Sequence, residues 1–157
     1  MPGPKVVAAV DLHKLSLLVA MRALEYASST GGDVVFVCVA EPNIANVKLP
    51  DEMDASDLTG TSLSRVQHFA VKAIAEFEKT HPGEKIPPFT SHIDTGDPAE
   101  KIVLAAAEAD ADVIFVATHG RTGIKRLLLG SVAEKVVRLA GCAVQVVREK
   151  HHTVSAD

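Results

Sequence analysis

The sequence predicts an α/β protein in which a doubly wound, five-stranded parallel sheet carries helices on both faces. Two observations support this prediction. First, four short runs are nearly continuous in apolar, mostly β-branched residues, which is typical of strands covered on both sides; they span 6–10, 34–40, 113–117 and 143–147. Second, segments with helical periodicity separate these runs, and strands that alternate with helices join by right-handed crossovers into a parallel sheet.

The first two helices follow from their apolar spacing. One covers about 14–29 and ends at Gly31-Gly32, because glycine readily takes the left-handed conformation that closes a helix. The other covers 62–80, before Pro82-Gly83. Their expected inward faces are Leu17, Leu18, Met21 and Leu24 in the first, and Leu63, Val66, Phe69, Ala70, Ala73, Ile74 and Phe77 in the second.

One alternating pattern of polar and apolar residues predicts a further strand, and two capping patterns predict two further helices. The segment 88–94 is more polar, with Phe89 and Ile93 on one side, and predicts an edge or half-buried strand. Asp97-Pro98-Ala99-Glu100 combines a capping acid, a proline at the first helical position and an acid at the third, and predicts a helix through Ala109. Ser131 with Glu134 repeats this spacing and is expected to cap the last helix. The expected inward residues of that helix are Val132, Val136 and Leu139.

Three segments lie outside this frame. Residues 41–61 contain the acidic cluster DEMDASD and are interpreted as a solvated loop, with a partner-binding lid as the alternative. Residues 118–130 form a long loop, and the polar tail 149–157 is expected to be disordered. The whole chain, 1–157, is expected to be one domain with its core at about 5–148.

The amino-acid composition argues against several classes of function. A net charge of −4 and an aromatic content of 4% argue against a protein that binds nucleic acid through basic surface and stacking side chains. No run approaches the 18 or so apolar residues of a membrane-spanning helix, and no signal peptide is evident. The two cysteines are too few for a disulfide scaffold, and Cys38 is expected to be an inert buried thiol. A cytoplasmic location is therefore expected.

The loop after the fourth strand is the best candidate for a ligand site. In open α/β sheets, ligands bind beyond the carboxyl ends of the strands, where the strand order reverses. Here Gly130-Ser131 leads into a helix whose first amides favour an anion, and Arg121, Lys125 and Arg126 add positive charge. This pattern predicts a phosphate cradle, although a glycine-rich turn with a serine cap also occurs for structural reasons alone.

Other nucleotide motifs are absent. The chain has no GxxxxGK[ST] loop, and the turn after the first strand, 11–16, contains no glycine, which excludes a GxGxxG fingerprint there. The same turn also lacks the glycine- and hydroxyl-rich character that a flavodoxin-like electron carrier needs.

Over about 5–148 the chain resembles the universal stress proteins. The matching segments are KVVAAVDLHKLS with Asp11 after the first strand, TGDPAEKIV at 95–103, and THGRTGIKRLLLGSVAEKVVR at 118–138. Of the family's pattern G-x2-G-x9-G-[ST], the later part is matched by Gly120, Gly130 and Ser131, while Ala117 replaces the first glycine. The resemblance implies an adenine nucleotide alpha hydrolase-like fold with strand order 3-2-1-4-5. It also implies the ATP-binding branch of the family, with weaker contact at the ribose.

The resemblance further implies which residues hold the nucleotide. Val10 and Asp11 would contact adenine and ribose, Val39 would form an apolar wall, and amides at Gly130 and after it would meet the phosphates. Mg or Mn would accompany ATP, with Asp11 nearby. The implied nucleotide-binding residues are Ala9, Val10, Asp11, Val39, Ala117, Thr118, His119, Gly120, Arg121, Gly130, Ser131, Val132 and Ala133.

Alternatives stay open for several of these residues. Asp11 or Ser16 could instead cap the first helix. His119 is interpreted as a solvent-facing loop residue, because no partner for acid–base catalysis can be named. His92, His151 and His152 show no spacing typical of a metal site. Gly130 is expected to allow close approach of the ligand to the backbone, so that a side chain there would obstruct binding.

Three functions are therefore carried forward. The first is an ATP-binding regulatory homodimer of the stress response that acts on an unidentified protein partner. The second is a slow ATPase in the same pocket, disfavoured because no residue that would position water is evident. The third is a dimeric adaptor that needs no nucleotide. The dimer would pair the last strand with its twin and bury Val144 and Val146, unless the tail from Glu149 covers that edge.

Overall fold

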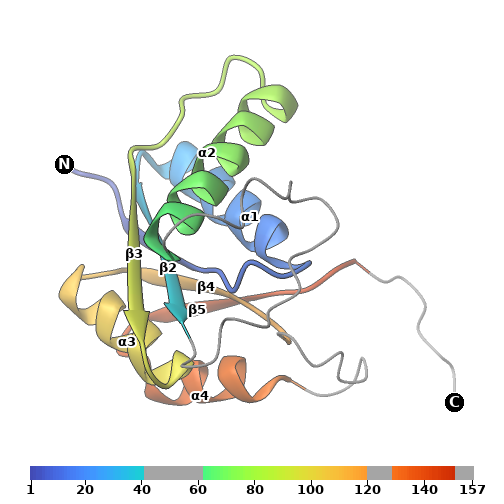
Figure 1. The fold of residues 1–157 in the computed structure, drawn as a ribbon. Helices are drawn as coiled ribbons and strands as arrows, with labels where there is room; N and C mark the ends of the chain where they lie inside the picture. Colours follow the sequence, from blue (N-terminus) through green and yellow to red (C-terminus); the bar gives the residue numbers. More distant parts are fainter. Residues whose placement is uncertain (41–61, 120–128, 151–157) are drawn as a thin grey trace, which may run out of the picture.

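The fold is a parallel sheet between two pairs of helices. The computed structural model describes residues 1–40, 62–119 and 129–150. The strand order is β3-β2-β1-β4-β5, and all pairings are parallel. The elements are β1 Lys5–Ala9, α1 Ser16–Thr30, β2 Asp33–Ala40, α2 Ser62–Thr80, β3 Phe89–Thr95, α3 Pro98–Glu108, β4 Val113–Ala117, α4 Ser131–Leu139 and β5 Ala143–Val147 (Figure 1). The predicted fold class and strand order are confirmed.

Two hydrophobic cores lie on opposite faces of the sheet. In β1, Val6 and Ala8 face the core formed with α1 and α2, while Val7 and Ala9 face the core formed with α3 and α4. This alternation follows from the two-residue period of a strand. It explains why β1, at the centre of the sheet, reads as a continuous apolar run. The predicted edge character of β3 is also confirmed, since its residues are exposed or half-buried.

The buried faces of the helices differ in part from the expected ones. In α1 the fully buried residues include Val19, Ala20 and Ala23, whereas the expected Leu17, Leu18 and Met21 lie half-buried at the margin of the core. Small alanines let α1 approach the sheet closely, so the larger side chains are displaced to its flanks. Two expected inward residues are exposed instead: Leu63 by 40% in α2 and Leu139 by 46% in α4.

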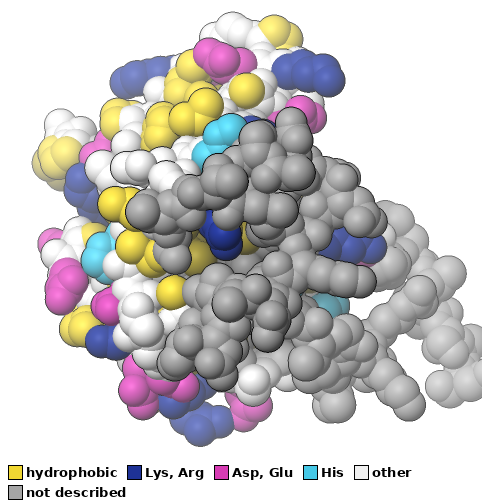
Figure 2. Space-filling model, viewed as in Figure 1, with side chains coloured by type: hydrophobic (Ala, Val, Ile, Leu, Met, Phe, Trp, Pro, Cys, Tyr) yellow, Lys and Arg dark blue, Asp and Glu magenta, His cyan; other side chains and the backbone are white. Residues whose placement is uncertain are grey.

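Helix ends follow the capping patterns at two of the three expected places. Gly31 ends α1 with φ of 71°, the left-handed conformation that glycine tolerates. Asp97 caps α3, with the Glu100 amide donating to its carboxylate at 3.0 Å. Lys135 of α4 lies 3.1 Å from the same carboxylate. The hydrogen bond from the Glu100 amide, followed by that from Lys135, lowers the pKa of Asp97. On the face shown in Figure 2, acidic and basic side chains lie interspersed over α3 and α4.

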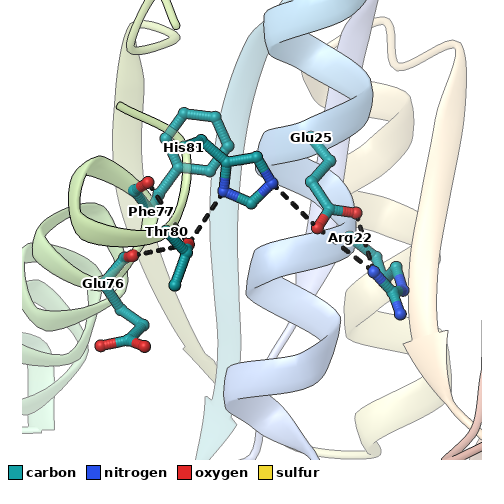
Figure 3. A network of polar contacts seen from close by, with 6 residues as sticks. All are labelled: Arg22, Glu25, Glu76, Phe77, Thr80 and His81. Atoms are coloured by element: carbon teal, nitrogen blue, oxygen red, sulfur yellow. Dashed lines mark hydrogen bonds and ion pairs between the residues drawn. The ribbon is translucent and has the colours of Figure 1, made fainter. Parts of the chain in front are cut away.

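A polar network joins α1 to the end of α2. The His81 ring stacks on Phe77 with a centroid distance of 4.5 Å, and its Nε2 lies 3.4 Å from a carboxylate oxygen of Glu25 (Figure 3). Glu25 also accepts from Arg22 one turn away, at 2.9 Å. The network lies on the helices that cover one face of the sheet and holds these two helices together.

Candidate functional site

The candidate site lies where the chain changes direction across the sheet. From β1 the chain winds outward through β2 and β3 and then returns to place β4 on the other side of β1. The carboxyl ends of β1 and β4 are therefore adjacent, and their connections leave on opposite faces. A ligand crevice is expected at such a switch point.

A tight turn after β1 fixes the Asp11 side chain. Its Oδ1 accepts hydrogen bonds from the His13 amide at 2.9 Å and from the Ser16 hydroxyl at 2.8 Å. The Ser16 hydroxyl in turn accepts from the Asp11 amide at 3.0 Å. Leu12, between them, takes a positive φ of 64°, which is unusual for a residue with a side chain. Within the part of the chain that the structure describes, Asp11 Oδ2 has no hydrogen-bond partner, and it is thus available to a ligand.

The alternative in which Asp11 or Ser16 caps α1 is wrong. The N-cap position of α1 is Leu15, which makes no side-chain capping bond, and Ser16 is the first helical residue. The Ser16 amide is instead satisfied by the carbonyl of His13 at 2.9 Å. Both polar side chains serve the turn rather than the helix.

At the end of β4, Gly130 packs directly against the strand. The Gly130 amide donates to the carbonyl oxygen of Thr118. A Cβ at Gly130 would lie 2.7 Å from that oxygen and 2.9 Å from Cα of His119. The requirement for glycine therefore comes from the protein's own backbone. The expectation that a side chain there would also obstruct a ligand stays a prediction.

The capping prediction for α4 is also wrong. Gly130 occupies the N-cap with an extended backbone, its carbonyl accepts from the Glu134 amide at 2.9 Å, and there is no side-chain cap. Ser131 is the first helical residue and is exposed. The amides of Ser131, Val132 and Ala133 have no acceptor within the helix, as in any first turn. These amides and the helix dipole favour an anion.

Buried polar atoms without partners occur in the turns after β1 and β4. Among the described residues, His13 Nε2, Thr118 Oγ1 and His119 Nδ1 are buried and make no hydrogen bond. One of these residues follows β1 and the other two follow β4. Native proteins pair nearly all buried polar groups, so such atoms point to a ligand or an ordered water as partner. His119 is half-buried, which corrects its interpretation as a solvent-facing loop residue.

The other expected site residues are partly brought together. Ala9 ends β1 and Val10 follows it; both are buried, and the Val10 amide donates to the Val37 carbonyl at 2.9 Å. Val39 and Ala117 are half-buried near the ends of β2 and β4. Ala133 is buried, so only its backbone could meet a ligand. Gly120 and Arg121, with Lys125 and Arg126, lie outside the described residues.

The described residues also bear on metal binding and on membrane insertion. Within 1–40, 62–119 and 129–150, no three histidine, cysteine or acidic side chains are grouped so as to hold a metal ion. None of the helices in those ranges combines the length and apolar character needed to cross a membrane. Cys38 is buried, and burial raises the pKa of the half-buried Cys142 thiol.

The strand order defines a doubly wound α/β protein whose switch point lies between β1 and β4. A model of the universal stress protein family matches residues 4–148, and the chain belongs to this family. A universal stress protein of Methanocaldococcus jannaschii is 34% identical over 145 residues, which make up 92% of this chain and 82% of that relative. The resemblance inferred from the sequence motifs is thus confirmed.

Solved structures share the fold. A universal stress protein in complex with cAMP aligns with a TM-score of 0.65 at 20% identity, covering 94% of this chain and 98% of that one. A universal stress protein from Archaeoglobus fulgidus in complex with dAMP gives a TM-score of 0.58 at 21% identity, covering 93% and 98%. At this level of identity the likeness establishes the architecture.

Proposed function

We propose that the protein binds an adenine nucleotide in the crevice between the carboxyl ends of β1 and β4. The observation that carries this proposal is that unpaired buried polar atoms occur in the turns after both β1 and β4, the second of which is hydrogen-bonded to the start of α4. The Asp11 carboxylate, held in place by Ser16, lies in the turn after β1. The cAMP and dAMP complexes of family members support adenine as the base.

Each part of the site suits one part of a nucleotide. Asp11 Oδ2 can accept a hydrogen bond from a ribose hydroxyl, because Oδ1 is already occupied by the turn. The half-buried Val39 offers apolar surface to the base, whereas Val10 is 3% exposed and would contribute little surface. The first amides of α4 can donate to phosphate oxygens, and Ser131 adds an exposed hydroxyl there.

Calorimetric titration with ATP, AMP and the matching guanosine nucleotides tests the proposal. We expect the adenine nucleotides to bind and Asp11→Asn to weaken them at least about tenfold, since a hydrogen bond to a charged group is lost. Asp110→Asn is a matched control on an exposed acid. Absence of binding by the wild type to any adenine nucleotide would reject the proposal.

We infer that the nucleotide regulates the protein, which would act on a partner in the stress response, rather than being turned over. Phosphoryl transfer needs a metal-holding acid and a group that positions the attacking water. Asp11 could supply the first, and no described residue of the crevice is suited to the second. Release of ADP from ATP at a rate that Asp11→Asn abolishes would support the slow ATPase instead.

We further propose a cytoplasmic homodimer formed through β5. β5 lies at the edge of the sheet. The Val147 carbonyl accepts from the Thr118 amide at 2.9 Å, so Val147 directs its backbone toward β4. Because these directions alternate along a strand, Val146 presents its amide and carbonyl to the open edge. An antiparallel twin would satisfy them and cover Val144, which is half-buried.

A further inference from the structure

The side chain of His13 carries a buried nitrogen atom to which the proposed site gives no role. His13 lies in the turn after β1, and the residue as a whole is half-buried. Its Nε2 atom is nonetheless buried, and within the described residues it has no hydrogen-bond partner. Burying a polar atom without a partner lowers stability, and native proteins satisfy nearly all such atoms. The nitrogen is therefore a candidate contact for a bound molecule.

The backbone of His13 is fixed by the turn on both sides. Its amide donates to Asp11 Oδ1 at 2.9 Å, and its carbonyl accepts from the Ser16 amide at 2.9 Å. Leu12, just before it, takes a φ of 64° and packs against the core beneath α1 and α2. Both backbone polar groups of His13 are therefore occupied, and only its imidazole is left to bind a ligand. The anchored turn fixes the point at which this imidazole leaves the backbone.

The same hydrogen bonds hold His13 next to the free oxygen of Asp11. The His13 amide is bonded to one carboxylate oxygen of Asp11, and the other oxygen, Oδ2, has no partner among the described residues. One short turn thus presents a carboxylate oxygen and an imidazole nitrogen together. An ionised carboxylate only accepts hydrogen bonds, whereas an imidazole nitrogen donates or accepts according to its tautomer, and a hydroxyl does both. The pair therefore suits two neighbouring hydroxyl groups.

We propose that His13 Nε2 forms a hydrogen bond with one ribose hydroxyl of the bound nucleotide while Asp11 Oδ2 accepts from the adjacent one. The 2′ and 3′ hydroxyls of a ribonucleotide are the neighbouring groups that this turn suits. A nucleotide that lacks either hydroxyl leaves one of the two side chains without a partner. His13 is thus a specificity-determining residue that favours ribose over deoxyribose. The inference rests on the proposed binding of an adenine nucleotide, but the two fail in different ways.

Removing Nε2 should weaken ATP binding and abolish the response to one hydroxyl. His13→Phe keeps a flat ring and has no ring nitrogen, so the affinity for ATP should fall about threefold to tenfold, the effect of one neutral hydrogen bond. The wild type should bind both 2′-deoxy-ATP and 3′-deoxy-ATP more weakly than ATP. His13→Phe should bind one of these two analogues as tightly as ATP, because the hydroxyl missing from that analogue has already lost its partner in the protein.

The experiment is a calorimetric titration of wild type, His13→Phe and His13→Gln with ATP and the two deoxy analogues. The side-chain amide of glutamine reaches about as far as Nε2, so His13→Gln should restore the affinity for ATP and the response to both hydroxyls. His92→Phe, on the edge strand β3, is the matched control and should leave all three affinities unchanged. If His13→Phe does not fold, His13→Gln against His13→Leu makes the same comparison.

Thermal unfolding without ligand provides a second measurement. His13→Phe should unfold at a temperature no lower than that of the wild type, because the substitution removes an unpaired atom and breaks no hydrogen bond. A lower unfolding temperature would show that Nε2 already has a partner, such as a buried water, and would overturn the proposal.

The titrations can overturn it in two further ways. Equal affinities of the wild type for ATP and both deoxy analogues would do so while leaving adenine-nucleotide binding intact. A His13→Phe variant that still discriminates against both analogues would also do so, because Nε2 would then contact another part of the ligand or none. If the wild type binds no adenine nucleotide at all, the proposed function fails and the role of His13 fails with it.

Discussion

The Ser16 hydroxyl and the Asp11 carboxylate are joined at 2.8 Å, and the same hydroxyl accepts from the Asp11 amide at 3.0 Å. Ser16 is 2% exposed, and both hydrogen bonds are partly buried. The first residue of α1 therefore sets the orientation of the acid that follows β1. The crevice owes the position of its carboxylate to the protein rather than to the ligand.

Ser16→Ala should both destabilise the fold and weaken nucleotide binding. The buried Asp11 amide would lose its acceptor, which should lower the free energy of unfolding by about 1–3 kcal/mol in urea denaturation. The freed carboxylate would bind ribose with less preorganisation, and affinity should fall several-fold in calorimetry. Ser29→Ala, on the exposed end of the same helix, is the control. Unchanged affinity in Ser16→Ala would contradict a positioning role.

Gly130→Ala should be destabilising even without a ligand. The new Cβ would lie 2.7 Å from the Thr118 carbonyl oxygen, so β4 and α4 must separate. We expect a loss of about 1–3 kcal/mol in the free energy of unfolding. Gly141→Ala is the matched control, because a Cβ there meets nothing within 4 Å. If the two variants are equally stable, the close contact is not required, and a larger side chain at Gly130 would then test the ligand alone.

Asp97 should contribute stability that depends on pH. Its pKa is lowered by the Glu100 amide and then by Lys135, so the charged form favours the folded state. This contribution is present above the pKa of the unfolded chain and is lost as the pH falls through the lower folded value. The stability difference between wild type and Asp97→Asn should therefore be present at neutral pH and fade below about pH 4. Asp97→Ala should cost more than Asp97→Asn at pH 7, since asparagine still caps a helix. A difference that persists in acid would contradict this account.

Triphosphate binding should depend on a divalent cation more than monophosphate binding does. Asp11 carries a negative charge at the crevice, and ATP brings more negative charge than AMP. Mg²⁺ or Mn²⁺ would offset the repulsion. Removing metal with a chelator should therefore weaken ATP more than AMP in parallel titrations. An equal response of the two nucleotides would mean that the phosphate chain is not held beside Asp11.

Val146→Pro should convert the proposed dimer to a monomer. The substitution removes an amide that faces the open edge of β5 and leaves the pairing of β5 with β4 in place. Light scattering at micromolar concentration measures the change. Val146→Ala keeps the amide and should remain dimeric. A monomeric wild type, or a dimeric Val146→Pro, would reject pairing through β5.

Much of the architecture is legible in the sequence because the strands are short and covered on both faces. The continuous apolar run at 113–117 can be recognised as a buried strand without any alternation of polar and apolar residues. Asp97 caps α3, as its spacing from Glu100 indicates. The expected cap at Ser131 fails because the N-cap is decided by the extended backbone of Gly130, which no residue spacing encodes. The inward face of α1 is misjudged because alanines such as Ala20 and Ala23 carry the closest packing.

The sequence predicts the position of the candidate site in the fold but not the contacts of its side chains. Asp11 is marked by its place after β1, but its bond with Ser16 depends on a turn through a residue with positive φ. The burial of Thr118 and His119 arises from the contact with Gly130, eleven or more positions further along the chain. Such long-range contacts are set by tertiary packing, so local spacing cannot show which polar atoms will lack partners.

Because the side chains of β1 alternate between two cores, the sheet separates the packing effects of a mutation on one face from those on the other. A change of volume at Ala8 is felt by α1 and α2, whereas one at Val7 is felt by α3 and α4. Each side can therefore vary its packing with little regard for the other. Deleting a single residue within β1 would affect both cores at once, because the side chains beyond the deletion would each turn to the opposite face of the sheet. The deletion would also shift Asp11 away from Ser16.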